Sequence, residues 1–306
     1  MILTMMDFTQ IARTQPSFRA YGGANGIKKG ILIDNVPYML KIEHQGKHRN
    51  KDYKYSILSE YISSRMYAML DIPTQEVILG KICAHSKEKL CVACKDFKEK
   101  GEYLYEFLNI KNSVLTDDSS NGAGTELKEI LEAIDKQNFC PSNEVKEHFW
   151  DMFIVDSYLG NFDRHNGSWG FLVNEFTGTK RLAPVFDCDC CLYPAQTDEQ
   201  LQAFLSDPKE MEKRVYVLPR SIIEENGAKI NYHDFLLSTK NRDCLSAVNK
   251  IVPKIEQTSQ SITDFINNID ILSSVRKKFY IKILSMRRNL ILKPALRYAI
   301  NRTRQR

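Results

Sequence analysis

The sequence predicts an α+β fold in two lobes, a small β-rich lobe followed by a larger helical one. Short apolar runs rich in β-branched residues, typical of strands, gather before residue 95, whereas the strongest later segments show the apolar spacing of helices. Between them lies the charged segment 95–103, KDFKEKGEY, which contains a glycine and is typical of a connector. We therefore expect an N-lobe at residues 1–97 and a helical C-lobe at residues 98–306.

The composition argues against several classes of protein. Of the 306 residues 43% are hydrophobic, which is enough for an ordinary core, and no run of about 18 apolar residues occurs, so we expect no membrane span. The first ten residues, MILTMMDFTQ, lack the basic and apolar regions of a classical signal peptide, which favours a cytoplasmic location. The same residues show no strong periodic pattern of apolar residues and predict no helix or strand.

The eight cysteines are not needed as a disulfide framework in so long and charged a chain. Paired thiolates suit tetrahedral zinc, so Cys91 and Cys94 with Cys188, Cys190 and Cys191 leave a zinc site as an alternative. The second group is not a clean C-x2-C motif, and both groups lie in strand-like runs where cysteine serves as a small apolar residue. We favour the packing role.

Positive charge is concentrated at the C-terminal end of the sequence. Residues 276–306 contain eleven Lys or Arg and no acid, although the whole chain carries a net charge of only +5. Such a tail could bind nucleic acid or an acidic partner. However, Phe279, Ile283, Met286 and Leu290 recur at helical spacing, which favours a helix packed on the body. We expect residues 296–306, beyond Pro294, to be the contact arm.

The N-lobe is expected to begin with two strands between Phe18 and Glu43, joined by a hairpin turn at Asp34-Asn35. Gly22, Gly23 and Gly26 precede the first strand, and glycines there either let backbone amides approach a phosphate or simply form a turn. The strand YMLKIE carries Lys41, and a lysine among apolar neighbours needs an anionic partner.

The next predicted helix, residues 53–70, offers that partner in Glu60. A strand lysine paired with a helix glutamate is how protein kinases hold the α- and β-phosphates of ATP, although Glu60 could also be an exposed helix acid. Residues 75–79 and 89–94 read as further strands of a sheet of about five. An adenine could then lie against backbone groups from Val92 to Phe97, including Cys94.

The C-lobe is expected to contain a loop at residues 116–124 and helices at residues 125–134 and 143–160. The second helix places Asp156 on its buried stripe. A buried carboxylate needs hydrogen-bond donors, and the polar turn that follows could supply them. We therefore interpret Asp156 as an orienting residue.

The stretch LGNFDRHNGSWGFLVN, residues 159–174, carries the densest set of polar residues. Phosphoryl transfer requires an acid near the attacking hydroxyl, which Asp163 can supply, and a metal-binding acid on a neighbouring strand, which Asp187 can supply. The expected metal-binding position, five residues after Asp163, holds Ser168, whereas Asn166 stands at plus three, so the sequence leaves the metal ligand open between them. His165 could orient Asp163 or bind a phosphate. We expect a hairpin of residues 169–173 and 181–186.

The motifs GGANG, YMLK, NFDRHNGSWGFL and PVFDCDCCLYP resemble those of the HipA-like serine/threonine protein kinases, over residues 18–194. The resemblance implies a two-lobed kinase fold that binds ATP and Mg²⁺. Lys41 would anchor ATP, Asp163 would be the catalytic aspartate and Asp187 the metal-binding one, while nucleotide binding would extend to Gly22, Gly23, Asn25 and Gly26. Ser168 and Asp189 depart from the family pattern. Because the chain is shorter than full HipA toxins, the resemblance does not extend to antitoxin binding or operator DNA binding.

Three functions follow as hypotheses. The first is a protein kinase that phosphorylates Ser or Thr in a protein substrate, including itself, with the resemblance also suggesting delivery into host cells by a non-classical route. The second is a lipid or small-molecule kinase, because D-R-H-N also resembles the phosphoinositide kinase loop. The third is a degenerate kinase that acts as a binding module, which Ser168 and Asp189 motivate.

Overall fold

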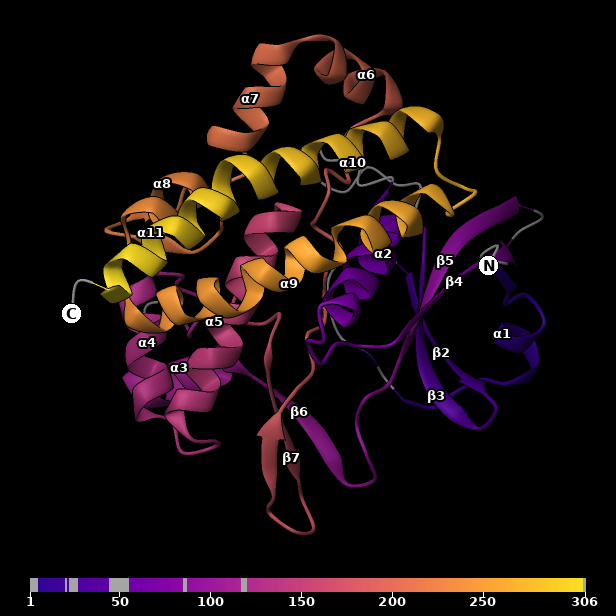
Figure 1. Ribbon diagram of the computed structural model, residues 1–306. Coiled ribbons are helices and arrows are strands. Elements are labelled where there is room, and N and C mark those ends of the chain that lie inside the picture. Colours follow the sequence, from indigo (N-terminus) through magenta and orange to yellow (C-terminus); the bar gives the residue numbers. More distant parts are fainter. Residues whose placement is uncertain are drawn as a thin grey trace.

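The computed structural model describes residues 5–19, 21, 27–43, 55–84, 87–116 and 120–304. It confirms the α+β fold class: a five-stranded sheet with one long helix comes first in the chain, and a predominantly helical region follows (Figure 1). The boundary between residues 97 and 98 stays a prediction.

The large sheet has the strand order β1-β4-β5-β3-β2, and β1 runs parallel to β4 while the other neighbours are antiparallel. Its strands are β1 Met6–Asp7, β2 Ile27–Ile33, β3 Val36–Ile42, β4 Val77–Ala84 and β5 Lys87–Lys95. The predicted hairpin turn is confirmed, since Asp34 and Asn35 both have positive φ and join β2 to β3. Neither β1 nor the short helix α1, Ile11–Thr14, was predicted.

The two faces of this sheet belong to two separate cores. On one face Leu79, Val92 and Cys94 pack with helix α2, Ser56–Met69. On the other face Leu40, Cys91 and other side chains pack against Phe8 and Ala12 of the N-terminal segment. Because neighbouring strand residues point to opposite faces, Cys91 and Cys94 lie on opposite sides of the sheet. This separation removes the geometric basis for the zinc alternative.

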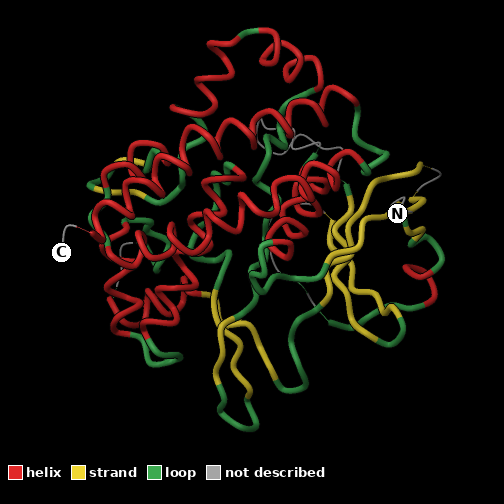
Figure 2. The backbone as a smooth tube through the Cα atoms, viewed as in Figure 1, coloured by secondary structure: helices red, strands yellow, loops and turns green. Residues whose placement is uncertain are grey.

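A second sheet of three antiparallel strands, ordered β6-β7-β8, links the two regions (Figure 2). Its strands are β6 Glu102–Glu106, β7 Gly170–Asn174 and β8 Lys180–Leu182. The predicted hairpin after the polar stretch is therefore present, with a shorter second strand than expected. It leads the chain from the polar stretch back to Asp187.

The helical region is built around the buried helix α5, Ser142–Leu159, which packs against α4, α9 and α10. Two short strands, β9 Glu224–Glu225 and β10 Ala228–Lys229, form a small hairpin that contacts α4. The remaining helices are α3 Phe107–Leu115, α4 Leu127–Lys136, α6 Asp198–Ser206, α7 Pro208–Tyr216, α8 Tyr232–Ser238, α9 Arg242–Asn267, α10 Ser274–Arg287, the π-helical turn η1 Arg288–Leu292 and α11 Lys293–Arg304.

The C-terminal basic segment is mostly a packed structure. Phe279 and Ile283 are buried, as their helical spacing predicted. Beyond them, residues 296–304 are not an arm, because they belong to α11, which packs on α8 and α9 and buries Ala295 and Ala299. Pro294 does not end the helix, because α10, η1 and α11 are continuous and the π-helical turn η1, in which the N–H of Lys293 bonds the carbonyl of Arg288, lies directly before the proline. Within the described residues, no helix has the length and apolarity needed to span a membrane.

Candidate active site

Lys41 and Glu60 form a buried ion pair between the sheet and helix α2. Lys41 lies on β3 opposite Val92 of β5, and its Nζ is 2.6 Å from Oε2 of Glu60. Burial would lower the pKa of Lys41, but the charges of Glu60, Asp187 and Asp189 raise it well above its ordinary value. The lysine is therefore a permanent cation. Oε1 of Glu60 accepts a hydrogen bond from the backbone N–H of Cys188 at 3.2 Å, which ties α2 to the segment that follows Asp187.

Asp187 and Asp189, on the segment that follows β8, lie close to the same lysine. Oδ1 of Asp187 lies 3.4 Å from Nζ of Lys41, and Oδ2 of Asp189 lies 4.0 Å from it. Burial opposes ionisation of Asp187, but the positive charges of Lys41 and Arg164 and a hydrogen bond from Ser168 outweigh it and lower its pKa to about 2. Asp187 is thus ionised at any physiological pH.

Asp189 behaves differently. Burial, together with the like charges of Asp187 and Glu60, raises its pKa to about 6 against the opposing effect of Lys41. Repulsion of this kind arises where several carboxylates face one another, and a cation placed between them would relieve it.

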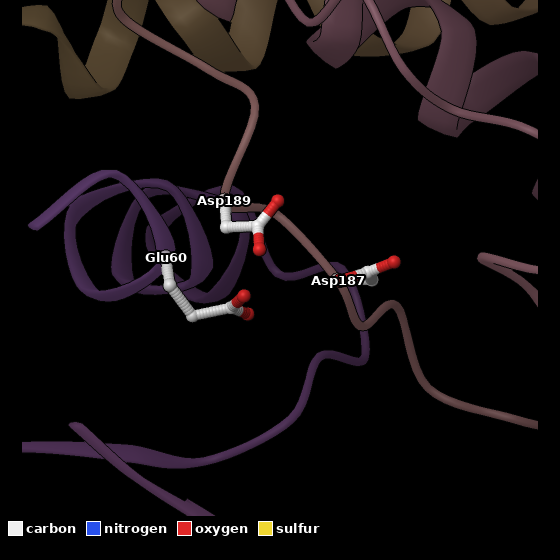
Figure 3. Close-up of side chains that lie close together, drawn as sticks. All are labelled: Glu60, Asp187 and Asp189. Carbon is white, nitrogen blue, oxygen red and sulfur yellow. The ribbon is translucent and has the colours of Figure 1, made fainter. Parts of the chain in front are cut away.

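Glu60, Asp187 and Asp189 together form a cluster of carboxylates. One oxygen from each lies within 4.8 Å of the others, and Figure 3 shows Glu60 on its helix and the two aspartates on the facing segment. Oxygen ligands at this spacing are the kind that Mg²⁺ prefers. The donor set therefore fits a magnesium ion.

Asp163 lies at the centre of the turn after α5. Its backbone N–H donates to Oδ1 of Asn161 at 3.0 Å, and the thiol of Cys190 donates to its Oδ2 at 3.7 Å. Burial and the nearby charge of Asp187 raise the pKa of Asp163, although His165, Cys190 and Lys229 oppose this rise. A carboxylate of raised pKa is a better proton acceptor than an ordinary aspartate.

Asp156 and Arg164 hold that turn in place. Asp156 accepts hydrogen bonds from Tyr67, Asn161 and Arg164 at 2.8 to 2.9 Å. Arg164 in turn donates to the carbonyl oxygens of Ser168 at 3.1 Å and Phe186 at 2.6 Å. One buried guanidinium thus joins the turn around Asp163 to the residue before Asp187.

His165 and Ser168 form a relay toward Asp187. Nδ1 of His165 accepts the backbone N–H of Gly167 at 3.1 Å, so this network assigns the ring proton to Nε2. Nε2 lies 3.1 Å from Oγ of Ser168, and that hydroxyl donates to Oδ2 of Asp187 at 3.0 Å. The two residues therefore orient the carboxylate of Asp187.

Asn166 faces away from this relay. Its Nδ2 donates to the carbonyl oxygens of Gly122 at 2.7 Å and Gly124 at 2.8 Å, and its side chain is buried. Asn166 thus fastens the end of the loop that precedes α4. The structure does not bring it into the carboxylate cluster.

The predicted nucleotide-binding residues fall into two groups. Gly22, Gly23, Asn25 and Gly26 lie outside the described residues. Val92 and Cys94 lie inside β5, which has β3 on one side and β4 on the other, so their backbone groups face sheet partners. The chain leaves the sheet only after Lys95, where the ring of Phe97 packs 5.7 Å from that of Phe186.

Sequence reasoning missed the roles of three residues here. Asp189 departs from a family pattern in the sequence, but the motif does not show that its carboxylate lies beside those of Glu60 and Asp187. That position depends on how the chain turns after Asp187. Arg164 was visible in the polar stretch without a defined partner. Tyr67 gave no signal, because its hydroxyl meets Asp156 from a helix far away in the sequence.

Known proteins of similar sequence and fold identify the family of this chain. No protein-family model matches the sequence. The serine/threonine-protein kinase CtkA of Helicobacter pylori strain J99 is 39% identical over 297 residues, which are 96% of this chain and 89% of CtkA. The crystal structure of the H. pylori proinflammatory kinase CtkA matches with a TM-score of 0.90 at 38% identity, covering 97% of this chain and 98% of that one.

A more distant structure is that of the Shewanella oneidensis toxin HipA in complex with HipB and its operator DNA. It gives a TM-score of 0.47 at 12% identity over 93% of this chain and 68% of that one, and the assignment does not depend on it. Because CtkA is so similar over nearly the whole of both chains, the chain belongs to the CtkA family of serine/threonine protein kinases.

Proposed function

We propose that this kinase uses ATP and Mg²⁺ to phosphorylate Ser or Thr hydroxyls, where the two predicted lobes, residues 1–97 and 98–306, meet. The observation that supports this most directly is the position of Lys41, whose ammonium group lies 2.6 Å from Glu60 and 3.4 Å from Asp187. In protein kinases the strand lysine and helix glutamate must be paired before the α- and β-phosphates are held. The chain has this pair formed.

We assign the metal to the acidic cluster. Asp187 and Asp189 would hold it, with Glu60 engaged by Lys41, and Ser168 would orient Asp187. We do not assign Asn166 as a ligand, because its amide holds two backbone carbonyls of the 122–124 loop. Bound magnesium would neutralise the negative charge that develops on the phosphates.

Asp163 would act on the acceptor. Its raised pKa suits a group that accepts a hydroxyl proton, and its position on a braced turn fixes the direction from which the hydroxyl approaches. His165 has a supporting role through Ser168. For the adenine we propose the segment after Lys95, beside Phe97, in place of Val92 and Cys94.

The test is transfer of radiolabelled phosphate from ATP to a generic protein substrate and to the kinase itself. Asp163→Asn and Asp187→Asn should each lower the rate by several orders of magnitude, because both act on the reacting groups. Asp270→Asn is the matched control, since Asp270 is exposed in the turn between α9 and α10. Label transfer at the wild-type rate by either active-site variant would refute the assignment.

The remaining expectations rest on the family resemblance or, for the basic tail, on its charge. Autophosphorylation, delivery into other cells and binding of nucleic acid or an acidic partner by the basic tail all stay predictions. The same labelling experiment tests the first, because a self-labelled band must disappear in Asp163→Asn. The comparisons favour the protein kinase over the lipid-kinase alternative.

A further inference from the structure

A small polar cavity lies between α5, α9 and α10, away from the Lys41 cluster. Its volume is about 200 Å³, and its polar lining residues are Tyr158, Ser259, Gln260, Thr263, Ser285 and Arg288. Figure 1 shows α10 running alongside α9, with α6 and α7 on its other side. No acidic side chain lines the cavity, as far as the described residues show.

Arg288, a half-buried residue, lines this cavity and brings a positive charge to it. Among the described residues, its Nε is buried and has no hydrogen-bond acceptor. Leaving a buried charged donor unsatisfied is costly, and in native proteins such a group usually has a water, ion or ligand as its partner. Arg288 also begins the π-helical turn η1, a distortion that is frequent at functional sites.

The other polar groups of the cavity divide into engaged groups and available donors. Ser259 and Thr263 donate their hydroxyl hydrogens to backbone carbonyls of α9, at 2.8 and 3.0 Å. Gln260 donates to Asp264 at 2.8 Å. Ser285 accepts from Asn289 at 3.5 Å and keeps its own hydrogen to donate.

Tyr158 adds a second donor close to Arg288. Burial raises the pKa of Tyr158, while the charges of Arg288 and Arg287 oppose that rise, so the hydroxyl keeps its proton and can donate it. The guanidinium and the two hydroxyls can each donate to a ligand, and the guanidinium adds a positive charge. Such a set selects an anion.

We propose that this cavity binds a small phosphate-class anion, either free phosphate or a small phosphomonoester. The guanidinium of Arg288 would take two phosphate oxygens, and the hydroxyls of Tyr158 and Ser285 the others. A cavity of about 200 Å³ is below the size of ordinary ligand pockets, which excludes a nucleotide. The site is new with respect to the kinase centre and does not depend on the proposed ATP chemistry.

The site adjoins the start of the turn that carries Asp163. The carbonyl oxygen of Tyr158 accepts a hydrogen bond from Arg287 at 3.3 Å, and Gly160 and Asn161 follow at once. An anion held by Tyr158 and Arg288 stabilises the last turn of α5 together with η1. Its binding is therefore visible as thermal stabilisation of the whole protein.

The experiment compares thermal unfolding in inorganic phosphate with that in chloride of equal ionic strength. The full chain is first saturated with Mg²⁺ and a non-hydrolysable ATP analogue, so that phosphate cannot enter the active site. Wild type should gain more stability in phosphate than Arg288→Gln does. Phosphate also stabilises proteins generally as an excluded salt, but that effect is common to every variant.

Arg297→Gln is the matched control, because it removes the same charge from an exposed position on α11. It should behave as wild type. Calorimetric titration should show phosphate binding weakened about tenfold or more by Arg288→Gln and less by Tyr158→Phe, which keeps the ring that fills the core. A parallel titration with glycerol 2-phosphate distinguishes a phosphomonoester ligand, which binds more tightly there, from free phosphate.

Two results would overturn the proposal. One is equal stabilisation of wild type and Arg288→Gln by phosphate. The other is no difference between phosphate and chloride for wild type. If Arg288→Gln does not fold, Tyr158→Phe decides the question, because undiminished phosphate binding by that variant contradicts the site as well.

Discussion

Arg164 and Asp156 form an ion pair in the interior of the helical region, with Nε of the arginine 2.9 Å from Oδ2 of the aspartate and side-chain exposures of 3% and 1%. The pair joins helix α5 to the turn that carries Asp163. Through the carbonyl of Phe186 it also reaches the segment of Asp187. The two acids assigned to catalysis and metal binding thus share one buried support.

Removing one partner of this pair should be far more costly than breaking a surface pair. Arg164→Met leaves Asp156 buried and partly unpaired, and we expect a loss of about 3 to 5 kcal/mol in the free energy of unfolding. The control is Arg181→Met, which breaks the pair with Glu102 at 2.7 Å, where the arginine side chain is 45% exposed, and should cost about 1 kcal/mol or less. Urea denaturation measures both. Similar losses in the two variants would show that Arg164 is not the support we describe.

Part of this support could be predicted from the sequence. Helical spacing placed Asp156 on the buried stripe, and the need of a buried carboxylate for donors pointed to the turn that follows. Both predictions are confirmed, since Asn161 and Arg164 of that turn donate to it. The donor from Tyr67 could not be predicted, because periodicity describes contacts within an element and not between α2 and α5.

The same limit explains the other differences. Strand β1 has two residues, too few for an alternating pattern, and exists through its pairing with β4. Asp189 joins Glu60 and Asp187 because the backbone turns sharply at Asp187, which has a φ of 61°, and a motif comparison does not register that turn. The arm expected after Pro294 is helical because α10 continues through the π-helical turn η1 into α11, and that turn lies directly before the proline.

Ser168 and Asn166 should respond to mutation in different ways. Ser168→Ala removes the hydroxyl that donates to Asp187, and we expect the Mg²⁺ concentration for half-maximal kinase activity to rise about tenfold or more, as for other groups that orient a metal ligand. Asn166→Ala removes two hydrogen bonds to the 122–124 loop, and should lower stability by about 1 to 3 kcal/mol with little change in the Mg²⁺ requirement.

Magnesium titrations of activity, together with urea denaturation, separate the two roles. A larger change in the Mg²⁺ requirement for Asn166→Ala than for Ser168→Ala would indicate that Asn166 is a metal ligand.

His148 should make the protein less stable in mild acid. Burial and the charges of Arg164 and Lys250 lower the pKa of this histidine from its ordinary 6.5 to about 4, and its Nε2 is buried without a partner among the described residues. Below pH 6.5 the imidazole of His148 is therefore protonated in the unfolded chain but stays neutral in the folded protein. Stability falls as the pH drops from 6.5 toward 4, by at most about 1.4 kcal/mol for each unit of the pKa difference.

His148→Gln should reduce that fall. The free energy of unfolding is measured for variant and wild type at pH 8 and at pH 5, and the difference between the two proteins is compared at the two pH values. The contributions of other titrating groups are the same in both proteins and cancel in this difference. An identical difference at both values would mean that His148 does not titrate as described.

Gly160 and Gly178 both have a positive φ, of 68° and 69°, but their surroundings differ. A Cβ at residue 178 would meet nothing, whereas one at residue 160 would overlap the guanidinium of Arg287, which is buried and cannot swing into solvent. Gly178→Ala should therefore cost only the backbone strain, about 1 to 2 kcal/mol. Gly160→Ala should cost a further 1 to 3 kcal/mol or so, as overpacked sites do.

The kinase activity of the same two variants distinguishes the effect of backbone strain from that of overlap with Arg287. Gly160 directly precedes the turn of Asp163, so displacement of Arg287 should slow phosphate transfer in Gly160→Ala and leave Gly178→Ala unaffected. If overlap is the cause, adding Arg287→Ala to Gly160→Ala should cost less than the sum of the two single changes, because the clash is already relieved. Additive losses would show that the left-handed backbone alone requires glycine at this position.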